Sequence, residues 1–499
     1  MARKSFTVHT SLLFDPKKKA FVENVSIEVD RASGSIARVF SRDDDDDDEI
    51  AENDDDIDLR GKVVLPGFVD SHAHIFIHSY DEQMRDVSAV ERIVRATNHA
   101  RAALLAGYTT YRDLGTEALG AADANLRDCI NRGITPGPRL FVATEALASS
   151  GSYETRIENR SLGGRGTGIG SGLAAPRASD AADGVDGVRA AVRRRVGDGA
   201  DLIKFYADYR RKIMRFPPRP AKKEDGDILF PPARRNPAVP LFTQEEMDAI
   251  VSEANLAEIP VAAHCGETRT ALMAARAGVT SVEHIFEDTY AVADELFAAL
   301  RRGNVLWVPT LAAAELLPRP MFEQVKASVK RAHASGVRFA AGGDTGTFNH
   351  GLNARELEIM IEAGIPLADV LVAGTVGGWE ACGGDRSGFR FGWFEHGNRA
   401  DIIALDADPR DDAKALRKVS FVMKDGQVWK HRGQPVAGMV PVPQWPDSDG
   451  GSSSSDGGGA DSDECIDDGE PWTDLSAARP HRLSMSVPLP VYQPRNAPV

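Results

Sequence analysis

Two histidines separated by one residue end a short apolar stretch, Val64–His74, which contains a Pro-Gly pair. Successive side chains of a β-strand point to opposite faces, so His72 and His74 would share one face and Ala73 would occupy the other. Two neighbouring imidazoles supply half of the ligands that a divalent metal such as zinc takes. A lone pair of this kind is more often structural, so the interpretation depends on further ligands.

Further residues of ligand type follow at the ends of other predicted strands, namely Lys204, His264, His284 and Asp344. Lys204 shares a strand face with Leu202 and Tyr206, which would point its amine into an interior where a charge is costly. Burial lowers the pKa of an amine, and a neutral lysine can react with carbon dioxide to give a carbamate that bridges two metals. Cys265 follows His264 directly and would point the other way, so we exclude it as a ligand.

The elements that would position these residues alternate between strand and helix from residue 63 to residue 395. The predicted strands cover 63–72, 108–114, 139–144, 201–206, 260–264, 281–285, 305–311 and 338–343. Predicted helices include 88–106, 118–132, 183–199, 243–257, 289–302 and 321–335. Eight such repeats predict an α/β fold, a (β/α)8 TIM barrel whose active site lies at the carboxyl ends of the strands. Each candidate ligand falls at such an end.

The chain on either side of this region reads as short strands. Residues 1–62 and 396–442 alternate apolar and polar side chains, which predicts one small composite β-sandwich built from N- and C-terminal segments. The acidic run 42–58 and the Gly-, Ser- and Pro-rich tail 443–499 are predicted to be disordered. Insertions at 149–182 and 207–240 follow strand ends and would serve as substrate loops, or be tolerated insertions without a role.

Charge and composition exclude several functions. The net charge is −15, and residues 43–58 and 443–499 carry more negative charge than this net value, so the acidity belongs to two segments and argues against nucleic-acid binding. The four cysteines are far apart and form no CxxC pair, as in a reducing compartment. The first residues lack the apolar run of a signal peptide, and no stretch is apolar and long enough to span a membrane, so we expect a cytoplasmic protein.

The candidate ligands, taken together, resemble the ligand set of the metal-dependent amidohydrolase superfamily. Local stretches resemble its imidazolonepropionase-like subgroup, which includes prolidase-like and ochratoxinase-like peptidases: they are 106–116, 133–139, 204–210 and 349–356. The resemblance implies two divalent metal ions, with zinc expected. His72, His74 and Asp344 would hold the buried ion, His264 and His284 the more exposed one, and carbamylated Lys204 would bridge them.

The resemblance also implies a reaction. A metal-bound hydroxide would attack the carbonyl of an amide or peptide bond in a small-molecule substrate, and Asp344 would pass a proton to the leaving nitrogen. A dipeptidase, a carboxypeptidase-like enzyme or an N-acyl amino acid hydrolase fits this chemistry. For substrate contacts we consider the side chains near the predicted strand ends, which are Tyr206, Tyr209, Arg210, His78, His350 and Glu267. Arg210 is suited to bind a carboxylate with two hydrogen bonds.

Two alternatives stay open at this point. The run His264-Cys-Gly-Glu267 resembles a motif of one-metal deaminases and cyclic amidine hydrolases, in which Glu267 would act as a proton shuttle. Enzymes of that kind lack a lysine on the fourth strand, whereas Lys204 is present here. The other alternative is a catalytically inactive barrel with a binding or assembly role, and a homo-oligomer is compatible with every interpretation.

Overall fold

The computed structural model describes residues 4–42, 55–79, 88–153, 178–210, 238–287 and 290–436. Residues 1–442 form one compact unit, and Pro443–Val499 form a second that lies outside the described residues. The predictions of disorder for the tail and for most of the acidic run, and the larger part of both insertions, fall on residues that are not described. At the end of the acidic run, Ile57–Asp58 form a short β-strand, so the prediction of disorder is wrong there.

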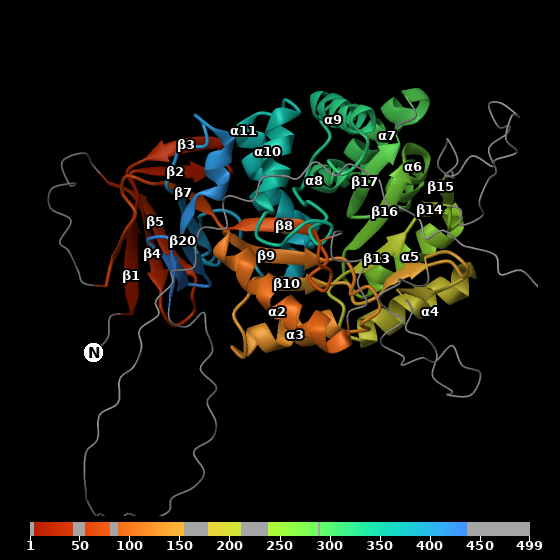
Figure 1. The fold of residues 1–499 in the computed structure, drawn as a ribbon, viewed down its shortest axis with the longest axis horizontal. Coiled ribbons are helices and arrows are strands. Elements are labelled where there is room, and N and C mark those ends of the chain that lie inside the picture. Colours follow the sequence, from red (N-terminus) through yellow and green to blue (C-terminus); the bar gives the residue numbers. More distant parts are fainter. Residues whose placement is uncertain are drawn as a thin grey trace, which may run out of the picture. The chain divides into compact units, whose positions relative to one another are not determined.

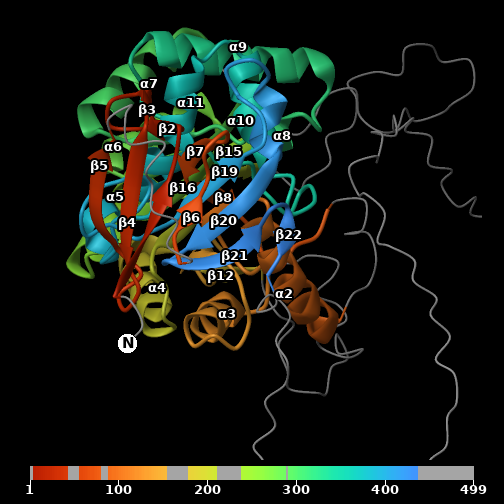
Figure 2. The same cartoon turned by 90° about the vertical axis from the view of Figure 1, so that its left-hand side faces the viewer.

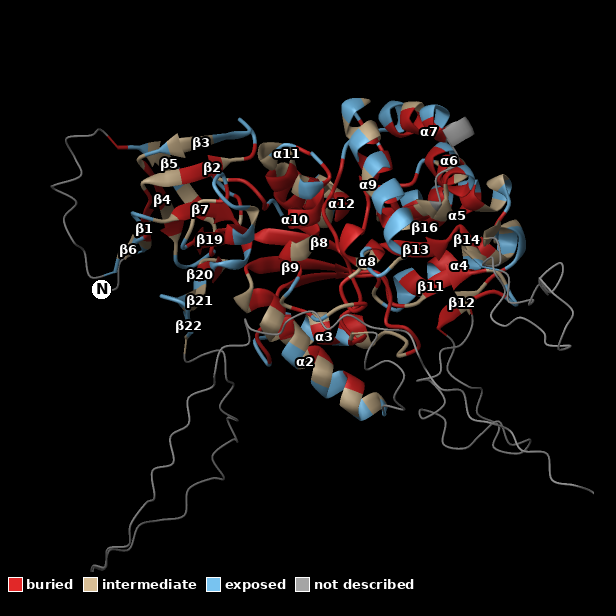
Figure 3. Ribbon diagram, turned by 45° about the horizontal axis from the view of Figure 1, so that its top comes forward, coloured by how far each residue is buried: buried red, intermediate tan, exposed pale blue. Residues whose placement is uncertain are grey.

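Two parallel sheets dominate the compact unit, so the α/β prediction is confirmed. The first has the order β10 (Arg139–Val142), β9 (Tyr108–Asp113) and β8 (Phe68–Ala73). The second has the order β12 (Ser179–Ala181), β11 (Ala146–Ala148), β13 (Ile203–Tyr206), β16 (Val261–Glu267), β17 (Ser281–Glu287) and β18 (Leu306–Val308). Figure 3 shows buried residues along β8, β9 and β13, whereas the helices around them carry exposed residues.

Hydrogen bonds join the two sheets along both edges. Asp201 N donates to Val142 O at 2.8 Å, next to β10 and β13. On the other side, parallel bridges pair Trp307 with Phe339 and Ala73 with Thr345, and Ser71 N donates to Ala341 O at 2.9 Å. The segment from Phe339 to Thr345 therefore connects β18 to β8.

The prediction of an eighth strand over 338–343 is wrong in its extent, because this segment is held by isolated bridges. Ala341 N donates to Ala373 O of the π-helical turn η3 (Ala373–Gly377) and not to a neighbouring strand. Gly342 also lies so close to β8 that a Cβ atom there would be 2.4 Å from His72 N. The close approach of two backbones replaces regular strand pairing.

Helices follow the strands along the chain (Figure 1). Ser88 caps α2 (Ala89–Leu105) by accepting a hydrogen bond from Glu91 N, and Thr243 and Glu246 form a capping box at α5 (Gln244–Leu256). The sequence analysis missed α6 (Thr268–Ala277), which begins directly after β16 with no loop to mark it. The remaining α-helices are α3 (Ala122–Asn131), α4 (Gly184–Gly197), α7 (Tyr290–Gly303), α8 (Leu311–Ala314), α9 (Arg319–Ala334), α10 (Ala354–Glu362), α11 (Leu367–Val372) and α12 (Gly378–Ala381).

Strands from both ends of the chain share one sheet (Figure 2). Its order is β22 (Gln434–Pro435), β21 (Gln427–His431), β20 (Val419–Lys424), β19 (Ile402–Leu405), β7 (Val63–Pro66), β2 (Leu12–Asp15) and β3 (Ala20–Glu23). A second sheet has the order β5 (Ile36–Ser41), β4 (Val25–Asp30), β1 (Ser5–His9) and β6 (Ile57–Asp58). Side chains of both, among them Val8, Ile27, Val64 and Phe421, pack in one apolar cluster.

The strand β7 ends one residue before β8, so the flanking sheets anchor the strand that carries the histidine pair. Within the described part of the chain, no helix is both long enough and apolar enough to cross a membrane.

Candidate metal centre

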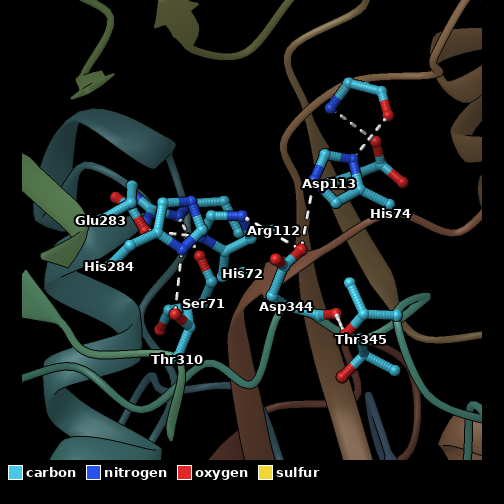
Figure 4. A network of polar contacts seen from close by, with 12 residues as sticks. Ser71, His72, His74, Arg112, Asp113, Glu283, His284, Thr310, Asp344 and Thr345 are labelled. Carbon is cyan, nitrogen blue, oxygen red and sulfur yellow. Dashed lines mark hydrogen bonds and ion pairs between the residues drawn. The ribbon is translucent and has the colours of Figure 1, made fainter. Parts of the chain in front are cut away.

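His72 and His74 meet Asp344 at the carboxyl end of β8 (Figure 4). The Nε2 atoms of both histidines lie 3.5 Å from Asp344 Oδ1. One ligand atom from each of the three residues lies within 4.8 Å of the other two. Zinc bonds of about 2.0–2.2 Å place neighbouring ligands of a tetrahedral site about 3.3–3.6 Å apart. The group therefore has the spacing that a metal ion requires.

Both histidines are held by their other ring nitrogen. His72 Nδ1 donates to Glu283 Oε2 at 2.9 Å, and His74 Nδ1 donates to Gly115 O at 2.9 Å. Carboxylate and carbonyl oxygens only accept, so each ring carries its proton on Nδ1 and has a free lone pair on Nε2. Burial, followed by the charge of Lys204, holds the pKa of His72 well below its usual value, which keeps the ring neutral.

Asp344 owes its orientation to an uncommon backbone conformation. Its φ of +61° lies in the left-handed region, which aspartate tolerates better than most residues. The next residue is fixed to β8, because Thr345 Oγ1 donates to Asp70 Oδ2 at 2.7 Å while Asp70 Oδ1 accepts from His72 N at 3.0 Å. Asp70 thus connects β8 to the segment that carries Asp344. Burial raises the pKa of the Asp70 carboxyl to about 6.

His284 and His264 extend the group as a row of rings. The ring centroid of His284 lies 4.6 Å from that of His72 and 4.5 Å from that of His264. His284 and Ile285 both have left-handed φ values, +75° and +68°, which is uncommon and costly for a β-branched residue such as Ile285. Strain of this kind within β17 is typical of functional sites.

These two histidines have polar neighbours at different distances. His284 Nδ1 lies 2.9 Å from Thr310 Oγ1, which leaves Nε2 for a ligand. His264 Nε2 lies 3.9 Å from Asp208 Oδ1, which is too far for a hydrogen bond. Among the described His, Cys, Asp and Glu residues, the group that meets at one point is His72, His74 and Asp344, and the other two histidines lie beside it.

Lys204 lies in β13 with its side chain buried, next to the strand that carries His264. Its neighbour Tyr206 is paired in register with His264. Burial lowers the pKa of Lys204 to about 8, against the opposing effect of the Glu283 and Asp344 charges. The amine is therefore part of the same charged environment as the predicted ligands.

The predicted substrate contacts fall into two sets. Beside the site, the Tyr206 ring lies 4.8 Å and the Tyr209 ring 6.1 Å from the ring of His264, and Arg210 ends the short strand β14 (Asp208–Arg210) as an exposed residue. Tyr206 also donates its hydroxyl to Glu117 Oε1 at 3.3 Å.

The second set lies in packed surroundings. His350 stacks on His99 at 4.2 Å between ring centroids and donates from Nε2 to Ile77 O at 3.0 Å, and His78 is buried. Glu267 ends β16, and its backbone N donates to Asp208 Oδ2 at 3.2 Å. A role of these three residues in substrate binding stays a prediction.

The sequence analysis missed three charged residues of the site. Arg112 and Glu283 form an ion pair of 2.7 Å that is wholly buried, and Asp208 faces His264. The sequence did contain a signal for Arg112 and Glu283. Each is a charged residue within a predicted interior strand, where burial of a charge is costly, as argued for Lys204. Asp208 lies in the stretch predicted as an insertion, and the structure places it at the start of β14.

A His-His-Asp group with a neighbouring buried lysine, at the carboxyl ends of parallel strands, is the arrangement that a metal-dependent α/β hydrolase would use. The chain belongs to the amidohydrolase family, whose sequence profile matches residues 63–430. The family generally uses divalent metals. This membership confirms the resemblance drawn from the sequence.

The chain is similar to ochratoxinase from Aspergillus niger, with 28% identity over 408 residues that cover 75% of this chain and 77% of the relative. The crystal structure of an Xaa-Pro dipeptidase with methionine bound in its active site is similar at a TM-score of 0.67 and 28% identity, covering 85% of this chain and all of that one (100%). The structure of A. niger ochratoxinase matches at a TM-score of 0.68, 24% identity and coverage of 86% and 96%, a likeness of fold. The chain is a hydrolase of amide-type carbon–nitrogen bonds that acts on small molecules.

Proposed function

We propose that this enzyme hydrolyses the amide bond of a small substrate that bears a carboxylate, such as a dipeptide or an N-acyl amino acid, at a two-metal centre. The observation that carries the proposal is the convergence of His72, His74 and Asp344 beside the buried amine of Lys204. Four imidazoles, a carboxylate and a lysine of lowered pKa form a donor set that suits two zinc ions better than one.

We also propose how the chain is divided into a barrel and a flanking sandwich. Residues 63–395 would form a (β/α)8 barrel, which the hydrogen bonds that join the two parallel sheets at both edges support. Residues 1–62 and 396–442 would form the composite β-sandwich, and the pairing of β7 (Val63–Pro66) with β2 and β19 extends this sandwich to residue 66.

His72, His74 and Asp344 would hold one ion, His264 and His284 the other, and Lys204 would bridge them as a carbamate. When bound, such ions lower the pKa of water and polarise a carbonyl. To form the carbamate, the Lys204 nitrogen lone pair adds to the carbon of carbon dioxide and the amine releases one proton. Its lowered pKa makes this step accessible near neutral pH, because the neutral amine is the reactive form.

Asp344 is suited to move the proton that the reaction requires. Its side chain is 16% exposed, and Oδ1 lies between the two Nε2 atoms. A carboxylate in this position can take a proton from the attacking water and deliver it to the leaving nitrogen. Both proton transfers need a carboxylate close to the reacting atoms. The left-handed backbone conformation of Asp344 is compatible with a side chain that lies 3.5 Å from both histidines.

The surroundings of the outer histidines favour an apolar substrate with an acidic end. Tyr206, Tyr209 and Phe286 lie around His264 and His284, with Phe286 at 5.1 Å from the ring of His284. Arg210 on β14 carries the cation for a substrate carboxylate. The names of the similar proteins, an ochratoxinase and an Xaa-Pro dipeptidase with bound methionine, agree with amide substrates of this kind.

Metal analysis combined with a hydrolysis screen tests the proposal. The wild-type chain should purify with about two equivalents of zinc and release an amino acid from Xaa-Pro dipeptides or N-acyl amino acids. Lys204→Ala should lose one ion and at least about 100-fold in turnover, and a short carboxylate such as formate should restore part of it by replacing the carbamate.

Three results would contradict the proposal. Unchanged turnover in Lys204→Ala would exclude the bridging role. Release of ammonia in place of an amino acid would support the one-metal deaminase with Glu267 as its proton shuttle. A chain without stoichiometric metal and without activity would support the inactive barrel.

A further inference from the structure

Arg112 and Glu283 form a buried ion pair behind His72 (Figure 4). Both side chains are 0% exposed, and Arg112 Nη2 donates to Glu283 Oε1 at 2.7 Å. Opposite charges withdrawn from water are costly unless further hydrogen bonds satisfy both groups. The surroundings of this pair supply such bonds.

Arg112 uses its remaining donors to connect several parts of the core. Its Nε donates to Ser71 O in β8, and its Nη1 donates to Ser281 Oγ in β17 at 2.9 Å and to Ala381 O in α12 at 3.1 Å. A planar guanidinium with this many partners has one orientation. Arg112 is therefore a fixed donor.

The same arrangement fixes Glu283. Its Oε1 accepts from Arg112 and from the hydroxyl of Ser281, so Oε2 is directed at His72 Nδ1, at 2.9 Å. A carboxylate can only accept, which requires the proton of His72 to be on Nδ1. The lone pair of His72 Nε2 then faces Asp344.

Comparison with His284 shows what this pair adds. The Nδ1 of His284 contacts the hydroxyl of Thr310, which can donate as well as accept, so this contact permits either tautomer. The partner of His72 permits one tautomer.

We propose that the Arg112–Glu283 pair is the positioning element that fixes His72 as an Nε2 ligand and so sets the affinity of the buried metal position. The inference rests on the proposed function, since it assumes a metal at His72, His74 and Asp344. Neither residue would touch the substrate. Their effect reaches the reaction through His72.

Glu283→Gln on the full-length chain is the decisive variant, because glutamine keeps the size of the side chain. The carbonyl of the introduced amide would accept from Arg112, which leaves the NH₂ group of that amide facing His72. His72 would then accept on Nδ1 and carry its proton on Nε2, where it blocks a metal. We expect the affinity for the tighter zinc equivalent to fall by about 10–100-fold, measured with Zn²⁺ alone in competition with a chelating indicator.

Arg139→Met is the matched control. Arg139 forms a buried ion pair with Asp401 at 2.8 Å, with side chains 7% and 1% exposed, and also bonds Thr110 Oγ1 at 3.0 Å. None of these partners is a predicted ligand. This variant should lower the unfolding temperature of the metal-free chain while its zinc affinity stays at the wild-type value.

The combined results separate the inference from the proposed function. Weaker zinc binding in Glu283→Gln, at a metal-free unfolding temperature close to that of the wild type, supports the inference. Wild-type zinc affinity in Glu283→Gln overturns the inference and leaves the proposed function standing. A wild-type chain that binds no zinc overturns both.

Discussion

The two halves of the candidate centre are built differently. His72 and His74 are buried, and each gives its Nδ1 proton to an oxygen that only accepts, on Glu283 and on Gly115. His264 is 17% exposed, and the carboxylate that faces it lies 3.9 Å away. His284 contacts a hydroxyl. The inner half of the centre, His72 and His74 with Asp344, is therefore held in one orientation by hydrogen bonds. The rings of the outer half, His264 and His284, have more rotational freedom.

This difference gives an order of binding. Ligands that are already oriented lose little entropy when an ion binds, whereas rings that must be ordered lose more. The first zinc ion should therefore bind at His72, His74 and Asp344 with higher affinity, and the outer position should fill second. The outer position, with the weaker affinity, would also lie next to Tyr206 and Tyr209, whose rings contact His264. Substrate would approach from this side.

Asp344→Asn should have the largest effect. The amide keeps the size of the side chain but cannot take up a proton, and its oxygen is a weaker metal ligand than a carboxylate. We expect kcat to fall by about 10³–10⁴-fold, the range that a general acid–base residue contributes at its upper end. Steady-state kinetics on the best substrate of the screen would measure the loss, with zinc content determined on the same samples.

The zinc content separates the two roles of Asp344. Loss of activity with two ions still bound would assign Asp344 to proton transfer, and loss of the inner ion would assign it to metal binding. A variant within about 10-fold of the wild-type kcat would contradict both roles.

Much of this centre could be predicted from residue types at the ends of strands. The rule of alternating faces was sufficient for Lys204 with Tyr206, because β13 pairs with β16 without a register shift. His72 and His74 lie close together although the pairing of β8 with β9 shifts between Asp70 and Ala73. The same rule fails at Glu283 and His284. It places neighbours on opposite faces, yet both contact His72, because the left-handed φ of His284 breaks the alternation.

The predicted eighth strand failed for a related reason. A run of small residues up to Gly343 has the pattern of a strand, but it also allows the segment to approach β8 closely and to bond η3. Backbone conformations of positive φ and contacts between distant segments decide such positions, and neither is encoded in the periodicity of one stretch.

Asp208→Asn should have an intermediate effect that is confined to the outer half. Asp208 accepts hydrogen bonds from Gly266 N at 2.8 Å and from the hydroxyl of Thr270, so its carboxylate connects the end of β16 to the start of α6 and faces His264. Removing the charge beside His264 Nε2 should weaken the second zinc equivalent by about 10-fold and leave the first unchanged. Titration with Zn²⁺ would resolve the two equivalents.

Thr270→Val is the control for this variant, since it removes one hydrogen bond to Asp208 and keeps the charge. Its second zinc equivalent should stay within about 3-fold of the wild-type affinity. An Asp208→Asn chain that loses the first equivalent instead would reverse the assignment of the two halves.

Glu356→Gln should leave the activity unchanged and alter only the pH dependence of the free energy of unfolding. Glu356 in α10 accepts from Ala312 N at 2.7 Å, and Ala313 N of the same turn donates to Gly343 O at 3.2 Å, next to Asp344. Burial raises the pKa of this carboxyl to about 8, and its Oε1 has no hydrogen-bond partner in the described structure. The folded chain therefore holds a proton here that the unfolded chain releases near pH 4.5.

Between these two pKa values the folded state binds more protons than the unfolded state, so its stability falls as the pH rises and levels off above pH 8. One such group contributes a slope of up to about 1.4 kcal/mol per pH unit. Glutamine resembles the protonated acid and has no proton to release, so this slope should be absent from Glu356→Gln. Urea unfolding of both chains from pH 5.5 to pH 8 measures it, and equal slopes would show that Glu356 is ionised in the folded protein.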